Sequence, residues 1–300
     1  MKLLEYEAKE LLASNDILIP LSIYVNHPDQ LEHAVETVGL PCMMKAQVFY
    51  GGRGKAGLVK KAETVEEAKN LYLTWSSEKK IEGVLVERVL SVEKEYYLSI
   101  IVDDIIGRPV IMASMNGGMD VEQSAQINPE GMVKKGVSVL GELQNFEALQ
   151  IARDAGFNGE QLLKFSELIR KTYEVFGKQD AKLLEINPVI LSEGNLYAGD
   201  AKMILDGNAA FRHSEWSKYE RSRKLNEMEK FAKEHHINYI DMDGNIAILS
   251  GGAGFTMALF DLIHFYGGKP ANFLDMTGGA SIPIEKMVDL IAMKARSDAK

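Results

Sequence analysis

The stretch Met43–Gly57 reads Met-Met-Lys-Ala-Gln-Val-Phe-Tyr-Gly-Gly-Arg-Gly-Lys-Ala-Gly. An apolar segment carries Lys45 and leads into a loop that holds four glycines and two further cations, Arg53 and Lys55. Glycine lets the backbone take positive φ and approach a ligand closely, so that successive N–H groups can converge on an anion. Lysine and arginine side chains both suit phosphate oxygens. The loop predicts a polyphosphate site, although a surface loop with solvated charges explains these residues equally well.

The loop differs from the two familiar phosphate-binding motifs. It does not end in Gly-Lys-Ser/Thr, as a Walker loop does, and it is not a G-x-G-x-x-G pattern at a strand-to-helix turn. A strand precedes it instead, and a return strand is expected around Leu58-Val59. This order places the loop as a flap over a sheet.

Composition and charge narrow the class of protein. With 300 residues, 46% of them hydrophobic and 26% charged, the chain is expected to be globular and to form two domains. The net charge of −9 argues against a nucleic-acid partner, which needs a basic face. No apolar stretch is long enough to span a bilayer and the N-terminus lacks a signal-peptide core, so a cytoplasmic or organelle-matrix location is expected, without a membrane.

The single cysteine, Cys42, lies in the apolar run before Lys45. One cysteine excludes an intramolecular disulfide and fits a reducing compartment. A buried thiol is the expected role of Cys42, rather than a nucleophile.

The first two hundred residues alternate between helical and extended patterns. Helices are expected at 3–13, 31–38, about 64–73, 146–155 and 160–176, and short extended pieces at 17–20 and 23–25. Strands are expected in the segment that carries Lys45, around 58–59, and at 84–89, 95–102, 108–113, 182–188 and 196–202. Asp103-Asp104 with Gly107, and Glu193-Gly194-Asn195, supply the turns of two hairpins.

The last third of the chain changes character. A long charge-rich helix is expected from Ser214 to His236 as a bridge between domains. A buried strand at 245–250, a helix, a strand at 271–275 and a last helix to about Ala295 then begin a doubly wound βαβα domain. Two strands and two helices cannot bury both faces of a parallel sheet, so this domain is expected to be cut short. The fold class is therefore α/β.

Three side chains on a predicted hairpin carry oxygens that suit Mg²⁺, namely Glu185, Asn187 and Asp200. Glu185 and Asn187 lie two apart on one strand and so share a face, while Asp200 lies on the partner strand. Lone polar residues on a half-wet sheet are the alternative. Glu87 and Glu95 have a similar alternative, as strand-end carboxylates in solvent.

The remaining polar residues give weaker signals. The six histidines show no metal spacing and no pairing with serine or cysteine, so none is assigned a catalytic role. The turn Gly251–Gly254 follows a predicted strand and resembles a nest for phosphate or carboxylate at a helix N-terminus. Tight packing of strand against helix explains these glycines about as well.

Taken together, these segments resemble the β subunits of succinate–CoA ligases (succinyl-CoA synthetases), which are ATP-grasp proteins. The resemblance extends in order over all 300 residues. The matching segments are 4–11, 45–48 with 51–57, 94–98, 112–114, 185–188, 206–209 with 211–212, 238–239, 243–246 and 270–275.

The resemblance implies two nested ATP-grasp subdomains at 1–228 and the N-terminal part of a flavodoxin-like CoA-ligase domain at 229–300. The lysine and the Gly-Arg-Gly flap would hold the phosphates, the segment from Glu87 to Leu90 would form the hinge that reads the purine, and Glu95 would bind polar groups of the nucleotide. Asn187 and Asp200 would hold Mg²⁺. The nucleotide-binding residues implied in this way are Lys45, Gly52, Arg53, Gly54, Glu87, Leu90 and Glu95.

In the family the phosphohistidine and most of the CoA site belong to a separate α subunit. The resemblance therefore implies that this chain supplies nucleotide and metal, and that phosphate passes to a histidine of an α subunit and on to succinate. The implied partners are the α subunit, CoA and a dicarboxylic acid. ATP and GTP stay open as the nucleotide, and αβ and (αβ)₂ stay open as the assembly.

Three departures from the family pattern bear on the substrate. Gly251 stands where the family has an asparagine that contacts the carboxylate substrate. Asn116 replaces a usual glutamate, and residues 276–279 replace a more glycine-rich turn. The chain also stops at Lys300, where family members continue, so a fragment or a second completing chain is expected.

These departures leave rival hypotheses. Malate or citrate replaces succinate as the acid in one of them, because of Gly251. In another the chain is a nucleotide-binding scaffold without catalysis of its own. A dinucleotide-dependent dehydrogenase built on the turn at Gly251 is disfavoured, because Asp275, at the ribose-binding distance, precedes a second glycine turn.

Overall fold

The chain divides into two compact units in a computed structural model, Met1–Tyr219 and Glu220–Lys300. The structure describes residues 1–78, 81–118, 131–139, 141–220, 226–235, 237–275 and 284–297. The predicted boundary after residue 228 falls inside a helix of the second unit, Glu227–Glu234.

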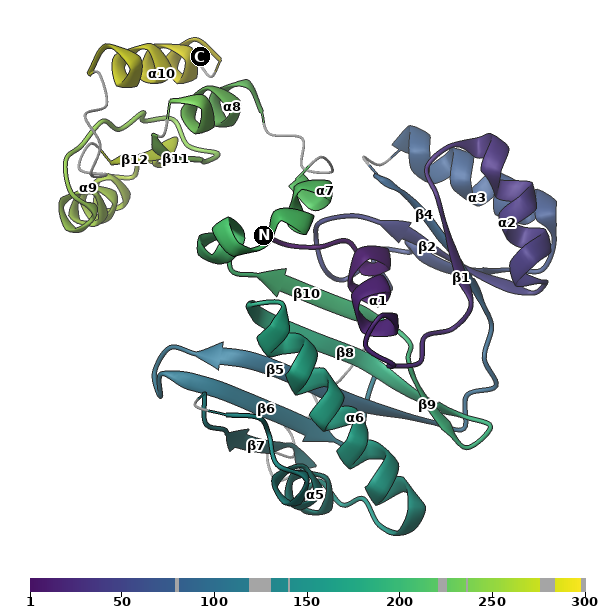
Figure 1. The fold of residues 1–300 in the computed structure, drawn as a ribbon. Helices are drawn as coiled ribbons and strands as arrows, with labels where there is room; N and C mark the ends of the chain where they lie inside the picture. The colour runs from purple at the N-terminus through teal and green to yellow at the C-terminus, as the bar shows by residue number, and fades with distance from the viewer. Residues whose placement is uncertain are drawn as a thin grey trace. The chain divides into compact units, whose positions relative to one another are not determined.

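The first unit contains a four-stranded antiparallel sheet with the order β1-β4-β2-β3. Helices α2 and α3 pack against this sheet (Figure 1), and their apolar side chains share one core with it. Cys42 is buried in this core, as expected, and burial raises the pKa of its thiol. The elements are β1 (Ser22–Val25), α2 (Leu31–Val38), β2 (Cys42–Gln47), β3 (Val59–Ala62), α3 (Val65–Glu78) and β4 (Gly83–Arg88).

Local sequence explains where these helices begin and end. In α2 the residues that face the core, at 31, 34, 35 and 38, follow the helical repeat. Gly39 ends the helix with φ of +89°, a conformation that glycine adopts without strain. Thr64 accepts a hydrogen bond from the N–H of Glu67 at 3.2 Å and so caps α3, which runs five residues beyond its predicted end at residue 73.

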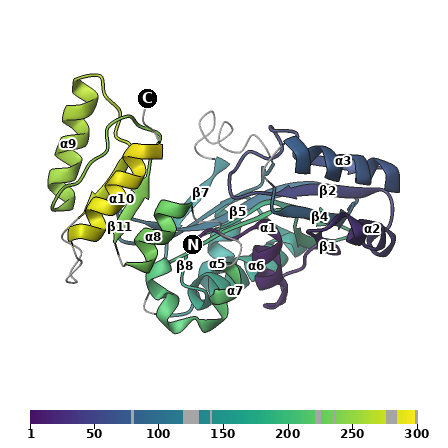
Figure 2. The same ribbon diagram turned by 90° about the horizontal axis from the view of Figure 1, so that it is seen from above.

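A second antiparallel sheet has the order β10-β8-β5-β6-β7, with β9 paired to β8. Helices α5 and α6 cover one face of it (Figure 2). The predicted 95–102 and 108–113 hairpin is confirmed, and Asp103 accepts the N–H groups of two turn residues. The elements are β5 (Lys94–Asp103), β6 (Arg108–Ser114), β7 (Val133–Gly136), α5 (Asn145–Asp154), α6 (Gly159–Lys178), β8 (Ala181–Ser192), β9 (Asn195–Ala198) and β10 (Ala201–Leu205).

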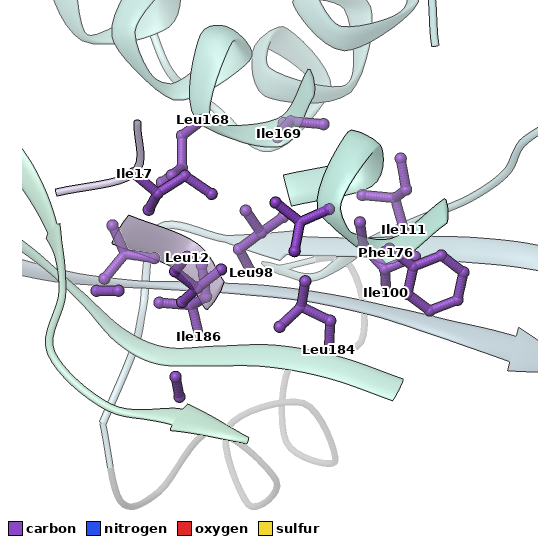
Figure 3. Packing of buried hydrophobic residues seen from close by; sticks show 14 of the residues in the cluster. Leu12, Ile17, Leu98, Ile100, Ile111, Leu168, Ile169, Phe176, Leu184 and Ile186 are labelled. Atoms are coloured by element: carbon purple, nitrogen blue, oxygen red, sulfur yellow. The ribbon is translucent and has the colours of Figure 1, made fainter. Parts of the chain in front are cut away.

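The core of this half lies between α6 and the sheet. Side chains from α6, among them Leu168 and Ile169, point toward side chains of β5 and β8 such as Leu98 and Leu184 (Figure 3). All four are buried, which accounts for the helical and alternating patterns of the sequence. This core gives the edge strand β10 a firm support.

Helix α1 (Glu5–Ala13) joins the two sheets within the first unit. Ala8 and Leu12 belong to the core of the larger sheet. Glu5 and Lys9, on the same side of the helix, contact side chains of the smaller sheet instead. The helix thus presents charged groups to side chains of the smaller sheet and apolar groups to the core of the larger one.

Residues 17–20, expected to be a short extended piece, belong to no strand. One strand prediction in the first unit is wrong in detail. The predicted strand 196–202 is broken at Gly199-Asp200 into β9 and β10. A side chain at Gly199 would lie 2.5 Å from Ile190 and 2.9 Å from the Pro188 carbonyl, so the chain passes too close to β8 for any other residue. The break leaves the Gly199 carbonyl and the Asp200 side chain free to face the region between the sheets.

The predicted single helix Ser214–His236 is also wrong. Short 3₁₀ turns, η3 (Gly207–Arg212) and η4 (Ser214–Trp216), lead into the four-residue α7 (Ser217–Glu220). Helix α8 (Glu227–Glu234) starts afresh, because the Asn226 side chain accepts a hydrogen bond from the N–H of Glu229.

The second unit has a small antiparallel pair, β11 (Asn238–Asp241) with β12 (Asn272–Asp275), and the helices α8, α9 (Ala253–Phe265) and α10 (Ile284–Ser297). The predicted strand 245–250 is wrong: Ile246 and Ser250 make isolated parallel bridges to residues 270 and 275, and most side chains between are not buried. The predicted helix after it, the strand near 272 and the last helix are confirmed. The turn predicted at 277–279 lies outside the described residues.

Candidate functional site

Lys45 lies at the centre of a buried group of charges in the first unit. It is opposite Leu85 in the β2–β4 register, so Glu87, two residues further along β4, shares its face. The Nζ atom lies 2.7 Å from Glu87 Oε1 and 3.2 Å from Glu5 Oε1, and it donates a hydrogen bond to the Gly199 carbonyl at 2.6 Å. Three segments far apart in the sequence thus converge on the lysine of the opening motif.

Lys9, one turn after Glu5 on α1, makes the same kinds of contact. Its Nζ atom lies 3.0 Å from Glu5 Oε1 and 2.8 Å from the Gly199 carbonyl, and it is ion-paired with Glu87. Lys9 and Lys45 therefore share all three partner groups, Glu5, Glu87 and the Gly199 carbonyl, although each binds a different oxygen of Glu87.

The flap between β2 and β3 delivers Arg53 to the same group. One guanidinium nitrogen, Nη1, lies 2.6 Å from Glu5 Oε2, and Nη2 donates to both carboxylate oxygens of Asp200 at 2.8 Å. The flap turn is closed by backbone hydrogen bonds from Ala56 to Gly52 and from Gly57 to Gly54. Gly52 has φ of +77°, where a side chain would be strained. The loop is an ordered turn with its arginine turned inward, so its interpretation as a loop of solvated charges is wrong for Arg53.

We name these six residues, Glu5, Lys9, Lys45, Arg53, Glu87 and Asp200, the charge cluster. Its three carboxylates balance its three cations. Burial alone would raise the pKa of Glu5, but Lys45, Lys9 and Arg53 hold it well below its usual range. Burial would likewise lower the pKa of Lys45 and of Arg53, yet the neighbouring carboxylates raise both above their ordinary values. Glu5, Lys45 and Arg53 are thus held in their charged forms by their partners in the cluster.

Of the two predicted metal ligands, Asp200 belongs to this cluster and Asn187 lies next to it. Asn187 donates its backbone N–H to the Asp200 carbonyl at 3.2 Å, and its side-chain oxygen accepts the N–H of Gly118 at 2.7 Å. Each side-chain oxygen keeps a lone pair beyond these bonds, and the Asp200 side chain is 38% exposed. Mg²⁺ takes few protein ligands, all of them oxygens, and fills the rest with water and phosphate. The donors of Asn187 and Asp200 fit that requirement.

Glu185, the third oxygen donor of the predicted hairpin, lies across from Lys202, and its Oε2 atom is 3.9 Å from the Lys202 ammonium. Among the described residues no group of three histidine, cysteine, aspartate or glutamate side chains is arranged to hold a metal ion. Asn187 and Asp200, an amide and a carboxylate, therefore remain the predicted metal ligands.

The remaining predicted nucleotide residues lie around the start of β5. Glu95 accepts the N–H of Gly117 with its backbone carbonyl at 3.0 Å, and a side chain at Gly118 would lie 2.8 Å from its carboxylate. Gly118 also binds Asn187, so Glu95 and the metal pair adjoin one glycine turn. Leu90 is partly buried in the connection between β4 and β5.

Glu87 departs from one of its two earlier interpretations. Its side chain is only 4% exposed and is ion-paired with Lys45 and Lys9, so it is not a solvated strand-end carboxylate. The expectation that it helps to read the purine stays a prediction.

Gly251 belongs to the second unit and is exposed. The next residue, Gly252, has φ of +91° and donates its N–H to the Asp275 carboxylate at 2.8 Å. The N-terminus of α9 thus binds a carboxylate of the chain itself. The role of Gly251 toward an acid substrate stays a prediction.

Sequence reasoning missed Glu5, Lys9 and the Gly199 carbonyl. A signal for the first two existed, since they stand four residues apart beside Ala8 and Leu12, on the apolar side of the predicted helix. Charged groups on an apolar helix face are rarely buried unless they are paired, so their presence there indicates oppositely charged partners elsewhere in the fold. The carbonyl had no signal, because its exposure depends on the break between β9 and β10.

A flap over a sheet edge, together with the cations that it gathers, is typical of the class of ATP-grasp proteins. A family model described as an ATP-grasp domain matches residues 2–191. Among solved structures, the fold is similar to that of an ATP citrate lyase from Methanothrix soehngenii, in complex with citrate and coenzyme A, with a TM-score of 0.70. The two are 19% identical, and the match covers 96% of this chain and 74% of that chain.

Curated relatives narrow the class further. The β subunit of the ADP-forming succinate–CoA ligase of Ignicoccus hospitalis is 41% identical over 285 residues, which are 93% of this chain and 75% of that protein. The corresponding subunit of Methanocaldococcus jannaschii is 38% identical over 294 residues, 96% of this chain and 78% of that protein. The chain belongs to the family of succinate–CoA ligase β subunits, which are ligases that form carbon–sulfur bonds. The family expected from the sequence is confirmed.

Proposed function

We propose that this chain binds ATP with Mg²⁺ at the charge cluster, and that it donates the terminal phosphate to a histidine of an α subunit, which uses it to join a dicarboxylic acid to CoA. Succinate is the proposed acid, since the curated relatives are succinate–CoA ligase subunits. The observation that carries the proposal is the convergence of Lys45 and Arg53 beside Asn187 and Asp200.

The residues of the cluster have distinct roles in this proposal. Lys45 supplies a point charge, and Arg53 supplies a planar fork of donors that suits the geometry of phosphate oxygens. Glycines 52 and 54 let the flap backbone come close to the nucleotide. Mg²⁺, held by Asn187 and Asp200, neutralises charge on the phosphate oxygens when it is bound. No step requires a base from the cluster.

The phosphate acceptor would come from outside this group. The described residues that contact Lys45 and Arg53 are carboxylates and backbone carbonyls. These hold cations in place but are not arranged as a nucleophile with a base. A histidine on a partner subunit supplies the missing group, as the family of this chain implies.

The test is phosphate transfer with the purified chain and an α subunit of a relative. Labelled ATP should phosphorylate the α subunit, and addition of CoA and succinate should yield a thioester. Lys45→Ala and Asp200→Ala should remove both signals while circular dichroism stays native. Unchanged phosphorylation by either variant would contradict the roles assigned to these residues.

The same assay separates the rival hypotheses. A nucleotide-binding scaffold would yield neither phosphorylated α subunit nor thioester. Malate and citrate, offered beside succinate, test the substrate, and GTP offered beside ATP tests the base. Lys178→Met, which changes an exposed lysine on α6, is the control and should retain full transfer.

A further inference from the structure

Lys9 has a role in the charge cluster that phosphate binding does not explain. Its side chain is only 1% exposed, and it shares the partners of Lys45, although it comes from helix α1 and not from the flap or the sheet. A buried ammonium needs compensation, and Lys9 receives it from two carboxylates and a carbonyl. The question is what a second lysine adds there.

The balance of charges in the cluster indicates what Lys9 adds. Without nucleotide, the cluster holds three cations against three carboxylates. If Lys45 and Arg53 turned to phosphate oxygens and Asp200 to Mg²⁺, the carboxylates of Glu5 and Glu87 would lose two of the three cations that they share. Only Lys9 remains paired with both of them.

We propose that Lys9 is a positioning residue, a resident counter-cation that compensates the charges of Glu5 and Glu87 and keeps both side chains in place while Lys45 and Arg53 transfer to the nucleotide phosphates. This inference rests on the proposed function, because it assumes that the cluster binds a nucleotide. It extends that function by naming what makes the release of the two cations favourable. Without Lys9 the carboxylates would compete with phosphate for Lys45.

The groups facing Glu5 make the effect measurable. They are Lys9 on its own helix, Lys45 on β2, Arg53 on the flap and the Gln47 side chain. Glu87 is the other carboxylate partner of the two lysines. Burial raises the pKa of Glu5, and only its cations hold it low. If Glu5 lost Lys9, Lys45 and Arg53 together, it would therefore take up a proton. In the native chain Lys9 stays, and Glu5 remains ionised.

The experiment is calorimetric titration of the full chain with MgATP at pH 7, in buffers of different ionisation enthalpy, which reports the number of protons taken up on binding. Lys9→Met should bind the nucleotide more weakly by about tenfold or more, the scale on which one opposite charge acts on a buried group. Its binding should also take up to about one proton that the wild type does not. Native affinity without extra proton uptake in Lys9→Met would overturn the inference.

Two further variants guard against a merely structural effect. The double variant Lys9→Met with Glu5→Gln restores the charge balance. It should recover part of the affinity for MgATP and lose the extra proton uptake. A double variant that binds still more weakly, with the proton uptake unchanged, would contradict the proposal. Lys178→Met is the matched control, since Lys178 also pairs with a glutamate four residues before it, but on an exposed helix face. It should bind as the wild type does.

The failures can be told apart. If the wild type does not bind MgATP, the proposed function fails and the inference falls with it. If the wild type binds, Lys45→Ala does not, and Lys9→Met binds normally, the proposed function stands and only the role of Lys9 is wrong.

Discussion

The first unit contains two groups of ion pairs with similar geometry and opposite surroundings. In the charge cluster, Glu5 is 2% exposed and lies 2.6–3.2 Å from its cations. In the second group, which we name the exposed clasp (Asp180, Arg212, His213 and Glu215), the two ring nitrogens of His213 lie 2.6 Å and 2.8 Å from the Asp180 and Glu215 carboxylates. There Glu215 is 52% exposed. Distance alone does not distinguish the two.

Burial decides what each group can do. Water screens the clasp, and its contacts contribute little beyond fixing the 3₁₀ turns after β10, together with the stacking of His213 on Trp216. In the charge cluster, water is largely excluded, and each charge depends on protein partners. A ligand that replaces those partners must therefore bring charges of its own, as a magnesium nucleotide does. This difference in burial is the reason why the charge cluster suits the proposed phosphate binding, whereas the exposed clasp serves local structure.

Removing one carboxylate from each group should separate them most clearly. Glu5→Gln leaves Lys9, Lys45 and Arg53 with one carboxylate fewer in a buried place, and it should lower the free energy of unfolding by about 3–5 kcal/mol. Glu215→Gln, its counterpart in the clasp, should cause a far smaller change. Urea unfolding followed by circular dichroism measures both. Equal losses in the two variants would refute the distinction by burial.

The two groups should also respond to pH in opposite directions. The pKa of Glu5 is lowered from 4.5, so its contribution to stability is complete above about pH 4.5 and is lost as the pH falls through the folded-state pKa. For His213, partial burial would lower the pKa, but Asp180 and Glu215 raise it above 6.5. Its contribution is complete below about pH 6.5 and is lost as the pH rises through the folded-state pKa.

Melting temperatures across pH check this prediction with two variants. The difference between wild type and Glu5→Gln should shrink as the pH falls below about 4.5. The difference between wild type and His213→Gln should shrink as the pH rises from 6 to about 9. A His213→Gln difference that grows over that range would show that the imidazolium is not the stabilised form.

The smallest predicted effect concerns the flap backbone that holds Arg53. Gly52→Ala should cost about 1–2 kcal/mol, because φ is +77° there while no atom lies within 4 Å of an added methyl group. Gly51→Ala is the matched control, with equal space and no positive φ, and it should leave stability nearly unchanged. Thermal unfolding of both variants is the measurement; a larger loss in Gly51→Ala would mean that crowding, not φ, governs the flap.

The helices and strands with periodic apolar residues could be predicted well from the sequence, because their signals are local. Helix α6 and the β5–β6 hairpin follow from apolar spacing and turn residues. The flap also followed from local signals, since glycines and cations stand together between two strands. The family came from motifs distributed along the whole chain.

What the sequence did not predict depends on contacts between distant segments. The predicted strand 196–202 looks continuous, but Gly199 passes so close to Pro188 and Ile190 that the strand breaks there. The placement of Glu5 and Lys9 beside Lys45 requires that α1 lie against the smaller sheet. The pattern within the helix indicates that the two charged residues need partners, but not which partners. The long helix predicted from Ser214 failed because high charge indicates solvation and not continuity.

The most direct test of the central claim is the titration of the purified chain with MgATP and MgGTP, beside Lys45→Ala. The account predicts that the wild type binds at least one of the two nucleotides and that the variant binds neither, while both proteins remain folded. Loss of binding would show that the buried lysine of the charge cluster holds the nucleotide. Undiminished binding by Lys45→Ala would contradict the account, since the cations of the cluster would then have no part in recognition.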